Sequence, residues 1–178
     1  MENQEVKPFQ FGVLRILDCG FFIEEAISDD LTIDIGYGMN FIYDIENNWV
    51  QFNVKAELKQ VTAGVIFISG TVLTRFFIPD LKSYQKESGL IEFPERSLEA
   101  LFGMAFTHMR AILAKNTAGS RYATMIIPIV NSATLFTDLF KSNVEVTKDQ
   151  LNSLKLDFSD RTDLQLFENG LINKLKPL

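Results

Sequence analysis

The sequence predicts an α+β fold, in which a four-stranded antiparallel sheet comes first and helices follow it. Four segments in the first half of the chain alternate apolar and polar residues and are separated by short turn sequences. One later stretch, 93–130, instead carries apolar residues at the three-and-four spacing of an α-helix. Strands that precede helices, rather than alternating with them, are typical of the α+β class.

The first two predicted strands contain residues that bend a sheet. The first strand is expected from Phe9 to Glu25, with a bulge around Asp18 to Gly20. The second is expected from Leu31 to Asp44, where apolar positions alternate and two glycines permit sharp bending. The acidic and amide residues at 46–48 then have the composition of a hairpin turn.

The third and fourth predicted strands complete an antiparallel meander. The third strand runs from Trp49 to Lys59, and the fourth from Val65 to Ile78. In the third strand, apolar residues alternate with a polar set, which predicts one solvent-facing side formed by Gln51, Asn53, Lys55, Glu57 and Lys59. Because the expected turns are short, consecutive strands are predicted to be neighbours.

A long helix is predicted after the sheet. Pro94 suits its first turn, and Glu95 and Glu99 suit the positive end of its dipole. Lys115 lies near the negative end, and Gly119 is expected to end the helix. One apolar stripe, which should lie on the sheet, consists of Leu98, Leu101, Phe102, Ala105, Met109, Ile112 and Leu113.

The opposite side of this helix carries small residues where a lone surface helix would carry Lys and Glu. Small side chains let another backbone approach closely, so a second packed face is expected. The stripe consists of Ala100, Gly103, Thr107, Ala111 and Ala114, with Met104 beside it. From the residues alone, a partner subunit and the chain's own C-terminal segment fit this face equally well.

The remaining chain is predicted to form shorter helices on the same domain. Ser132 can cap a second helix, SATLFTDLF, and Thr147 with Gln150 forms a capping-box pattern for a third. A last helical piece is expected from Asp160 onward. The domain is therefore assigned to residues 1–140, and residues 141–178 to a C-terminal helical extension of it.

The charge distribution argues against several classes of partner. The net charge is −6, and residues 1–46 contain ten acidic residues against two basic ones, so the whole acidic excess falls there, which disfavours nucleic acid. No apolar run approaches the ~20 residues that span a bilayer. The first ten residues lack the basic start and apolar stretch of a secretory signal, so a cytoplasmic location without membrane insertion is expected.

The sequence also lacks a recognisable catalytic constellation. One cysteine, Cys19, excludes an internal disulfide, and one histidine, His108, leaves too little for a usual zinc site. No phosphate-binding glycine loop, HExxH motif or nucleophile elbow is present. The expectation is therefore a protein that is not an enzyme and uses no cofactor.

Phenylalanine is unusually frequent, at 16 of 178 residues. Neighbouring residues of a strand point to opposite faces of the sheet. Only one member of each of the pairs Phe21-Phe22 and Phe76-Phe77 can therefore enter a given core. Some aromatic side chains must therefore face a helix, a partner or an apolar groove.

Three segments resemble the SecB family of export chaperones and the related SecB-like proteins. FGVLRILDCGFFIEEA is similar to the family's first strand, and FGMAFTHMRAILAKNTAG is similar to its long helix and following turn. MIIPIVNSATLF resembles the segment in which Pro, Val and Asn precede a second helix. The resemblance covers roughly Phe9 to Phe140, and it rests on the order and spacing of these motifs.

The resemblance implies a homotetramer, built as a dimer of dimers through the long helices, that holds unfolded client polypeptides without ATP. The small-residue stripe and Met104 then become the subunit contact. The outward aromatic residues become the client surface. The residues so implicated are Phe21, Phe22, Phe41, Tyr43, Phe52, Phe76, Phe77 and Phe106.

Departures from the family concern docking on the translocase motor SecA. Glu24 matches a glutamate that SecB uses there, but Gly20 stands where the family has an acid, and Ile68 to Gly70 supplies none. The family's short metal-site tail is also missing. The sequence therefore does not support SecA docking, and both an export chaperone and one dedicated to a client such as an antitoxin fit it.

Two other functions fit the predicted elements. A hotdog-like enzyme acting on acyl thioesters would wrap a sheet around the long helix and place a carboxylate near the helix N-terminus. Its candidates are Glu92, Glu95 and Glu99, which the helix dipole explains more simply. The other is an interaction module of a larger assembly that is not a chaperone.

Overall fold

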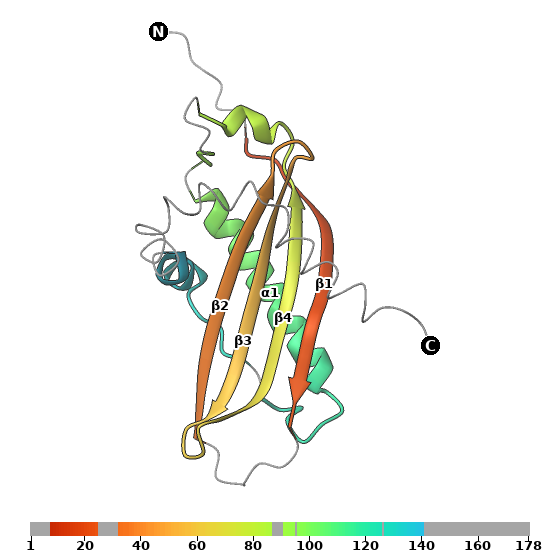
Figure 1. The fold of residues 1–178 in the computed structure, drawn as a ribbon, viewed down its shortest axis with the longest axis vertical. Coiled ribbons are helices and arrows are strands. Elements are labelled where there is room, and N and C mark those ends of the chain that lie inside the picture. The colour runs from red at the N-terminus through yellow and green to blue at the C-terminus, as the bar shows by residue number, and fades with distance from the viewer. Residues whose placement is uncertain (1–7, 25–31, 87–90, 95, 126, 141–178) are drawn as a thin grey trace, which may run out of the picture. The chain divides into compact units, whose positions relative to one another are not determined.

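The computed structural model describes residues 8–24, 32–86, 91–94, 96–125 and 127–140. Its elements are β1 (Gly12–Ile23), β2 (Ile33–Asp44), β3 (Trp49–Gln60), β4 (Val65–Phe77), the 3₁₀ turn η1 (Leu81–Tyr84) and α1 (Ser97–Thr117) (Figure 1). The four strands form one antiparallel sheet, and α1 lies across one of its faces. The predicted α+β class and the four strands are therefore confirmed.

The order of the strands in the sheet is β1-β4-β3-β2, so the predicted meander is wrong for the first strand. Strands β2, β3 and β4 are consecutive neighbours joined by four-residue turns at 45–48 and 61–64. Strands β1 and β2, in contrast, lie at opposite edges of the sheet and are separated in the sequence by residues 24–32. Nine residues easily span three strand spacings, about 14 Å, whereas four residues would have to be fully extended to reach that far. The result is a Greek-key order with β1 beside β4.

The register of β1 against β4 shifts at two places, between Val13 and Arg15 and between Asp18 and Gly20. The second shift confirms the bulge expected from the sequence. A bulge bends its strand and increases the local twist, which lets β1 follow the curve of the sheet. Near this bend the Asp18 carboxylate accepts a hydrogen bond of 2.7 Å from the Asn116 side chain, which ties β1 to the end of α1.

The core lies between the sheet and α1. Alternate residues of β3 point into it, and the matching residues of α1 are the predicted apolar stripe, of which Leu98 and Ile112 are only partly buried. The buried residues of these two elements are Val50, Phe52, Val54, Ala56 and Leu58 from β3, and Leu101, Phe102, Ala105, Phe106, Met109 and Leu113 from α1. The face that α1 packs on is therefore the one predicted.

The opposite face of β3 is less wet than the alternation predicts. Gln51 and Asn53 are only 4% and 9% exposed. The Arg75 guanidinium donates to Gln51 Oε1 through Nε and Nη2, at 2.9 and 2.7 Å, and Gln51 donates in turn to Asn53 at 3.0 Å. Arg75 also lies 4.0 Å from the Trp49 ring centroid. This network explains why two polar residues are buried where a solvent-facing pair was expected.

Helix α1 begins about one turn later than the sequence suggests. Pro94 precedes the helix, and its carbonyl accepts bonds from the Ser97 amide and hydroxyl at 3.0 and 2.6 Å. Arg96 occupies the N-cap with a left-handed φ of 62°. Glu99 lies in the first turn and Lys115 in the last, as predicted, and Glu95 lies outside the described residues.

Residues 132–140 are helical, as predicted, but their cap is Asn131 rather than Ser132. The Asn131 Oδ1 accepts bonds from the amides of Ala133 and Thr134 at 3.0 and 3.3 Å, which is N-cap geometry. Phe136 packs on Phe102 of α1, with ring centroids 5.5 Å apart.

The chain divides into two compact units, Met1–Phe136 and Thr137–Leu178. Of the second unit the structure describes only residues 137–140. The helices expected at 147–150 and from residue 160 onward therefore lie outside the described residues, as does the extension assigned to 141–178.

Candidate binding surface of aromatic residues

Seven aromatic rings form a closed circle of contacts on the α1 side of the sheet. Neighbouring ring centroids in this circle are 4.9 to 6.3 Å apart. In order, the circle contains Phe9, Phe11, Phe76, Phe52, Phe41, Phe93 and Tyr84, and Tyr84 returns to Phe9. Segments far apart in the sequence thus meet in one apolar surface.

Further rings extend this circle along α1 and β2. Phe102 contacts Phe52, Phe106 and Phe136, at 6.1, 6.1 and 5.5 Å between centroids. Tyr37 of β2 packs edge-on against Phe106 at 5.3 Å, and burial raises the pKa of its phenol. We call the circle of seven together with Tyr37, Tyr43, Phe102, Phe106 and Phe136 the aromatic cluster.

The aromatic cluster has a buried base and an exposed rim. Phe52, Phe76 and Phe102 are fully buried and fix the base within the core. On the rim, Phe11 and Tyr43 are 42% and 40% exposed, and the remaining rings, apart from buried Phe106, are half-buried. Rings held from below by the core keep their apolar surface open at little entropic cost.

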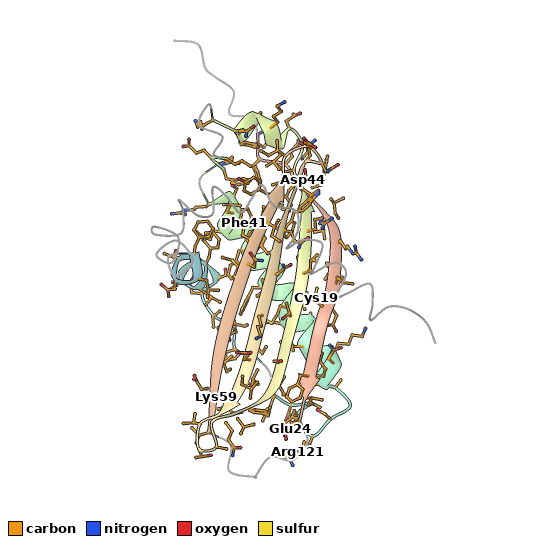
Figure 2. The ribbon with its side chains drawn as sticks, in the orientation of Figure 1. Cys19, Glu24, Phe41, Asp44, Lys59 and Arg121 are labelled. Atoms are coloured by element: carbon orange, nitrogen blue, oxygen red, sulfur yellow. The ribbon has the colours of Figure 1, made fainter. Side chains whose placement is uncertain are left out.

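The structure separates the eight predicted client-binding residues into three groups. Phe52, Phe76 and Phe106 are core residues, so their prediction as surface residues is corrected: each lies on the covered face, under α1 or within it. Phe41, which projects from β2 (Figure 2), and Tyr43 belong to the half-exposed rim. Phe21 is half-buried, and Phe22 and Phe77 are exposed outside the aromatic cluster.

The structure adds rim residues that the sequence did not single out, namely Phe9, Phe11, Tyr37, Tyr84, Phe93 and Phe136. Phe9, Tyr84 and Phe93 come from irregular segments, where no alternation shows which way a side chain points. The high phenylalanine content of the sequence is the feature that could have indicated them, because the rim residues come from many different segments of the chain.

Both edges of the sheet are unpaired within the described residues, since β1 and β2 are its outermost strands. An unpaired edge strand presents backbone N–H and C=O groups that can pair with an extended polypeptide. The rim residues Tyr37, Phe41 and Tyr43 all come from β2. Half-exposed aromatic rings and an outermost strand therefore occur together there, a combination used in strand addition.

The predicted subunit contact on α1 is largely open to solvent. Ala100, Thr107, Ala111 and Ala114 are exposed, while Gly103 and Met104 are partly covered. The Ser132 hydroxyl oxygen lies 3.2 Å from the position of a Cβ on Gly103. Part of the chain's own C-terminal half therefore covers the stripe at Gly103. The oligomer interface itself stays a prediction.

A shallow cavity of about 420 Å³ lies beside the first turns of α1, and its lining includes Arg96, Glu99, His108 and Ser132. Burial lowers the pKa of His108, and its Nδ1 lies 3.2 Å from Thr74 Oγ1. The hotdog-like hypothesis, which expects a carboxylate here, stays an untested prediction. Glu92 is exposed and pairs with Lys86 at 2.9 Å.

Cys19 and Glu24 both lie on or beside β1 (Figure 2). Burial raises the pKa of the Cys19 thiol, which favours the unreactive protonated form expected from the sequence. Glu24 closes the strand: its amide donates to the Phe67 carbonyl at 2.8 Å, and its carbonyl accepts from the Tyr122 hydroxyl at 3.1 Å. The side chain of Glu24 is exposed, and its contact with SecA stays a prediction.

Within the residues that the structure describes, no group of three or more His, Cys, Asp or Glu is placed to hold a metal ion. In the same part of the chain, no helix has the length and hydropathy needed to cross a membrane.

Comparison with protein-family models finds no match, and comparison with curated proteins finds none. Among solved structures, the chain is similar to a SecB-like chaperone of Mycobacterium tuberculosis in complex with a ChAD peptide from the HigA1 antitoxin. That alignment has 11% identity and a TM-score of 0.44, and covers 67% of this chain and 84% of the other. A protein of unknown function from Streptococcus agalactiae aligns at 10% identity and a TM-score of 0.36, over 64% and 92% of the two chains.

Proposed function

We propose that this protein is an ATP-independent chaperone that holds non-native polypeptides on the aromatic cluster. The observation that supports this most is the cluster's half-exposed rim above a buried base. A folded partner would need one complementary surface, whereas an unfolded segment can place its apolar side chains between such rings one at a time. The sequence resemblance to SecB-like proteins points to the same function independently.

The energy available per ring is modest, as release of a client requires. A large aromatic side chain has 150 to 250 Å² of surface, so covering the ~40% still exposed on Phe11 or Tyr43 stabilises a complex by about 2 kcal/mol. Several such contacts, with backbone hydrogen bonds to the outermost strand β2, are sufficient for reversible binding without nucleotide hydrolysis.

The proposal also includes the oligomeric assembly of the protein and its role in the cell. We place the protein in the cytoplasm as a homo-oligomer, a dimer of dimers joined through the small-residue stripe of α1. The mass of the protein from light scattering at neutral pH gives the number of subunits in the oligomer. Its clients are either exported proteins or one dedicated partner such as an antitoxin, and neither catalysis nor a cofactor is part of the function.

Suppression of aggregation tests the proposed function. The wild-type protein, at several-fold molar excess and without ATP, should suppress the light scattering of a chemically denatured client on dilution. Replacement of two exposed rim residues, in Phe11→Ser with Tyr43→Ser, should remove most of this effect, because it removes rim surface without opening the core.

Phe22→Ser is the matched control. Phe22 is 48% exposed, similar to the two rim residues, but it has no ring contact with the aromatic cluster. This variant should retain most of the activity. Absence of suppression by the wild type would reject the chaperone function, and equal losses in the control and the rim variant would reject the aromatic cluster as its site.

A further inference from the structure

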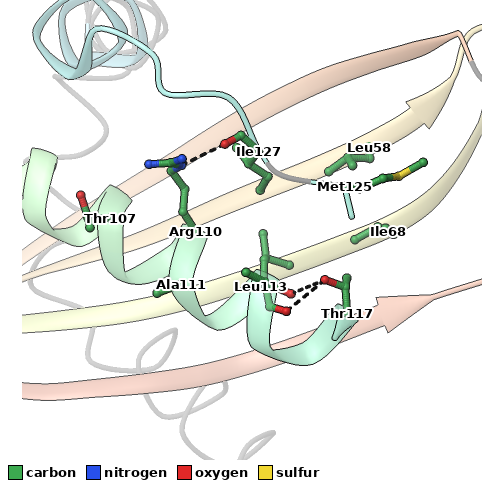
Figure 3. Close-up of a pocket in the computed structure, with 10 residues that line it drawn as sticks. Leu58, Ile68, Thr107, Arg110, Ala111, Leu113, Thr117, Met125 and Ile127 are labelled. Carbon is green, nitrogen blue, oxygen red and sulfur yellow. Dashed lines mark hydrogen bonds between the residues drawn. The ribbon is translucent and has the colours of Figure 1, made fainter. Parts of the chain in front are cut away.

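An apolar cavity of about 250 Å³ lies between α1, strands β3 and β4, and the two residues Met125 and Ile127 (Figure 3). Its apolar lining comes mainly from Leu58, Ile68, Leu113, Met125 and Ile127. Ala111 and Ala114, two members of the small-residue stripe of α1, also line it. No residue of the aromatic cluster lines this cavity.

Met125 and Ile127 form one wall of the cavity, and the turn before Met125 holds that residue in place. The Met125 amide donates to the Tyr122 carbonyl at 2.9 Å. Tyr122 is almost fully buried, with its ring 5.3 Å from that of Phe67 and its hydroxyl bonded to the Glu24 carbonyl. A wall anchored in this way favours a cavity that exists before any ligand arrives.

Two polar side chains in the lining differ in how fully their hydrogen bonds are used. The Thr117 hydroxyl donates back to the helix, at 3.0 Å from the Leu113 carbonyl and 3.2 Å from that of Ala114. Arg110 uses only Nε, which donates to the Ile127 carbonyl at 3.1 Å. Within the described residues its two Nη groups have no protein acceptor, and Figure 3 shows the guanidinium beside the cavity.

We propose that this cavity binds a medium-chain aliphatic carboxylate, with the chain among the apolar side chains and the carboxylate on the Arg110 Nη groups. An engineered 150 Å³ apolar cavity takes benzene, so a 250 Å³ cavity takes roughly ten non-hydrogen atoms. Eight to ten carbons match that size. A planar guanidinium fixed through Nε presents its remaining donors in the paired geometry that carboxylates prefer.

Methyl NMR on the wild-type protein tests the proposal without any substitution. With ¹³C-methyl methionine, sodium decanoate below its micelle concentration should shift the Met125 signal in a saturable way. Met104 lines the shallow cavity beside the first turns of α1, so its signal serves as an internal control and should stay unchanged. Absence of a saturable Met125 shift, or equal shifts of both signals from nonspecific apolar binding, would overturn the proposal.

Substitutions separate the carboxylate contact from the apolar part. Arg110→Gln should weaken decanoate binding about tenfold and leave binding of the uncharged 1-decanol unchanged, since a charge-assisted hydrogen bond is lost. Lys115→Gln, an exposed cation one helical turn further along α1, is the matched control and should change neither. Equal decanoate affinity in Arg110→Gln and wild type would refute the role of Arg110.

Ala114→Leu should fill the cavity and weaken both ligands. If this variant does not fold, the Met125 shift in the wild type still decides the matter. The rim variant of the aromatic cluster should bind decanoate as the wild type does, so failure of the chaperone proposal and failure of the cavity proposal give different results. Competition by an unfolded client for the Met125 site would instead assign the cavity to a client side chain.

Discussion

At the scale of single residues, His108 provides a titration that can be followed without interference from other histidines, because it is the only one. Burial lowers its pKa below the ordinary value of 6.5, and its Nδ1 contacts the hydroxyl of fully buried Thr74. As the pH falls below about 6.5, His108 therefore takes up a proton in the unfolded chain before it does so in the folded chain. By linkage, the free energy of unfolding should fall over that window and level off below the folded-state pKa.

His108→Asn keeps a hydrogen-bonding group near Thr74 and removes the titration. Urea unfolding at pH 7.5, 6.5, 6.0 and 5.5, chosen to bracket the unperturbed pKa, should show wild-type stability falling relative to this variant as the pH decreases. Parallel curves for the two proteins, or a wild type that gains on the variant at low pH, would contradict the assigned environment of His108.

The sequence pattern predicted which side chains of a strand point to opposite faces, but it did not predict which of those faces is buried. The argument that Phe76 and Phe77 cannot share one core is confirmed, since Phe76 is fully buried and Phe77 is 38% exposed. Alternation says that two faces differ but does not say which one a helix covers. For that reason the strand residues Phe52 and Phe76 were expected on the surface although they form the core, and Phe106 of α1 is buried with them. The rim residues Phe9 and Tyr84 meet only through tertiary contacts that no local pattern records.

At the scale of elements, α1 packs closely on β4 at Gly70. A Cβ placed there would lie 2.5 Å from Leu113 Cδ2 and 3.2 Å from its Cγ, and Leu113 is itself buried. Gly70→Ala should therefore push α1 from β4 and destabilise the protein by about 1 to 3 kcal/mol. For a chain of this size that is a fall in Tm of roughly 2 to 12 °C.

Gly36→Ala is the matched control for this contact, because a Cβ on Gly36 meets no heavy atom within 4 Å. Its Tm should change little, or rise slightly through the lower entropy of the unfolded chain. Differential scanning calorimetry of the two variants measures the difference. A Gly70→Ala protein as stable as the Gly36→Ala protein would show that the helix and sheet do not pack as closely as described.

The elements themselves were largely predictable. Each strand and the long helix carry their own periodicity, and the bulge near Asp18 has a local signature in Gly20. The neighbour of β1 was not predictable in this way, because the nine-residue connection is compatible with several partners. The start of α1 was placed too early because the backbone of Arg96 takes a left-handed conformation, which Pro94 does not signal.

At the scale of the whole molecule, the compact unit Met1–Phe136 presents two different surfaces. The α1 side carries the aromatic cluster, with apolar rings open to solvent. The opposite side of the sheet is more polar, with the Arg75–Gln51–Asn53 network and a Lys55–Glu57 ion pair. A chaperone that works through the aromatic cluster should therefore hold its clients on the first side.

Site-specific photocross-linking tests this claim most directly. A photoreactive phenylalanine analogue is placed at Tyr43, on the rim, or at Lys55, which is exposed on the polar side of the sheet. Each protein is then irradiated with a labelled, chemically unfolded client. The account predicts strong cross-linking from position 43, little from position 55, and loss of both when the client is folded. Equal cross-linking from the two positions, or none from position 43, would contradict it.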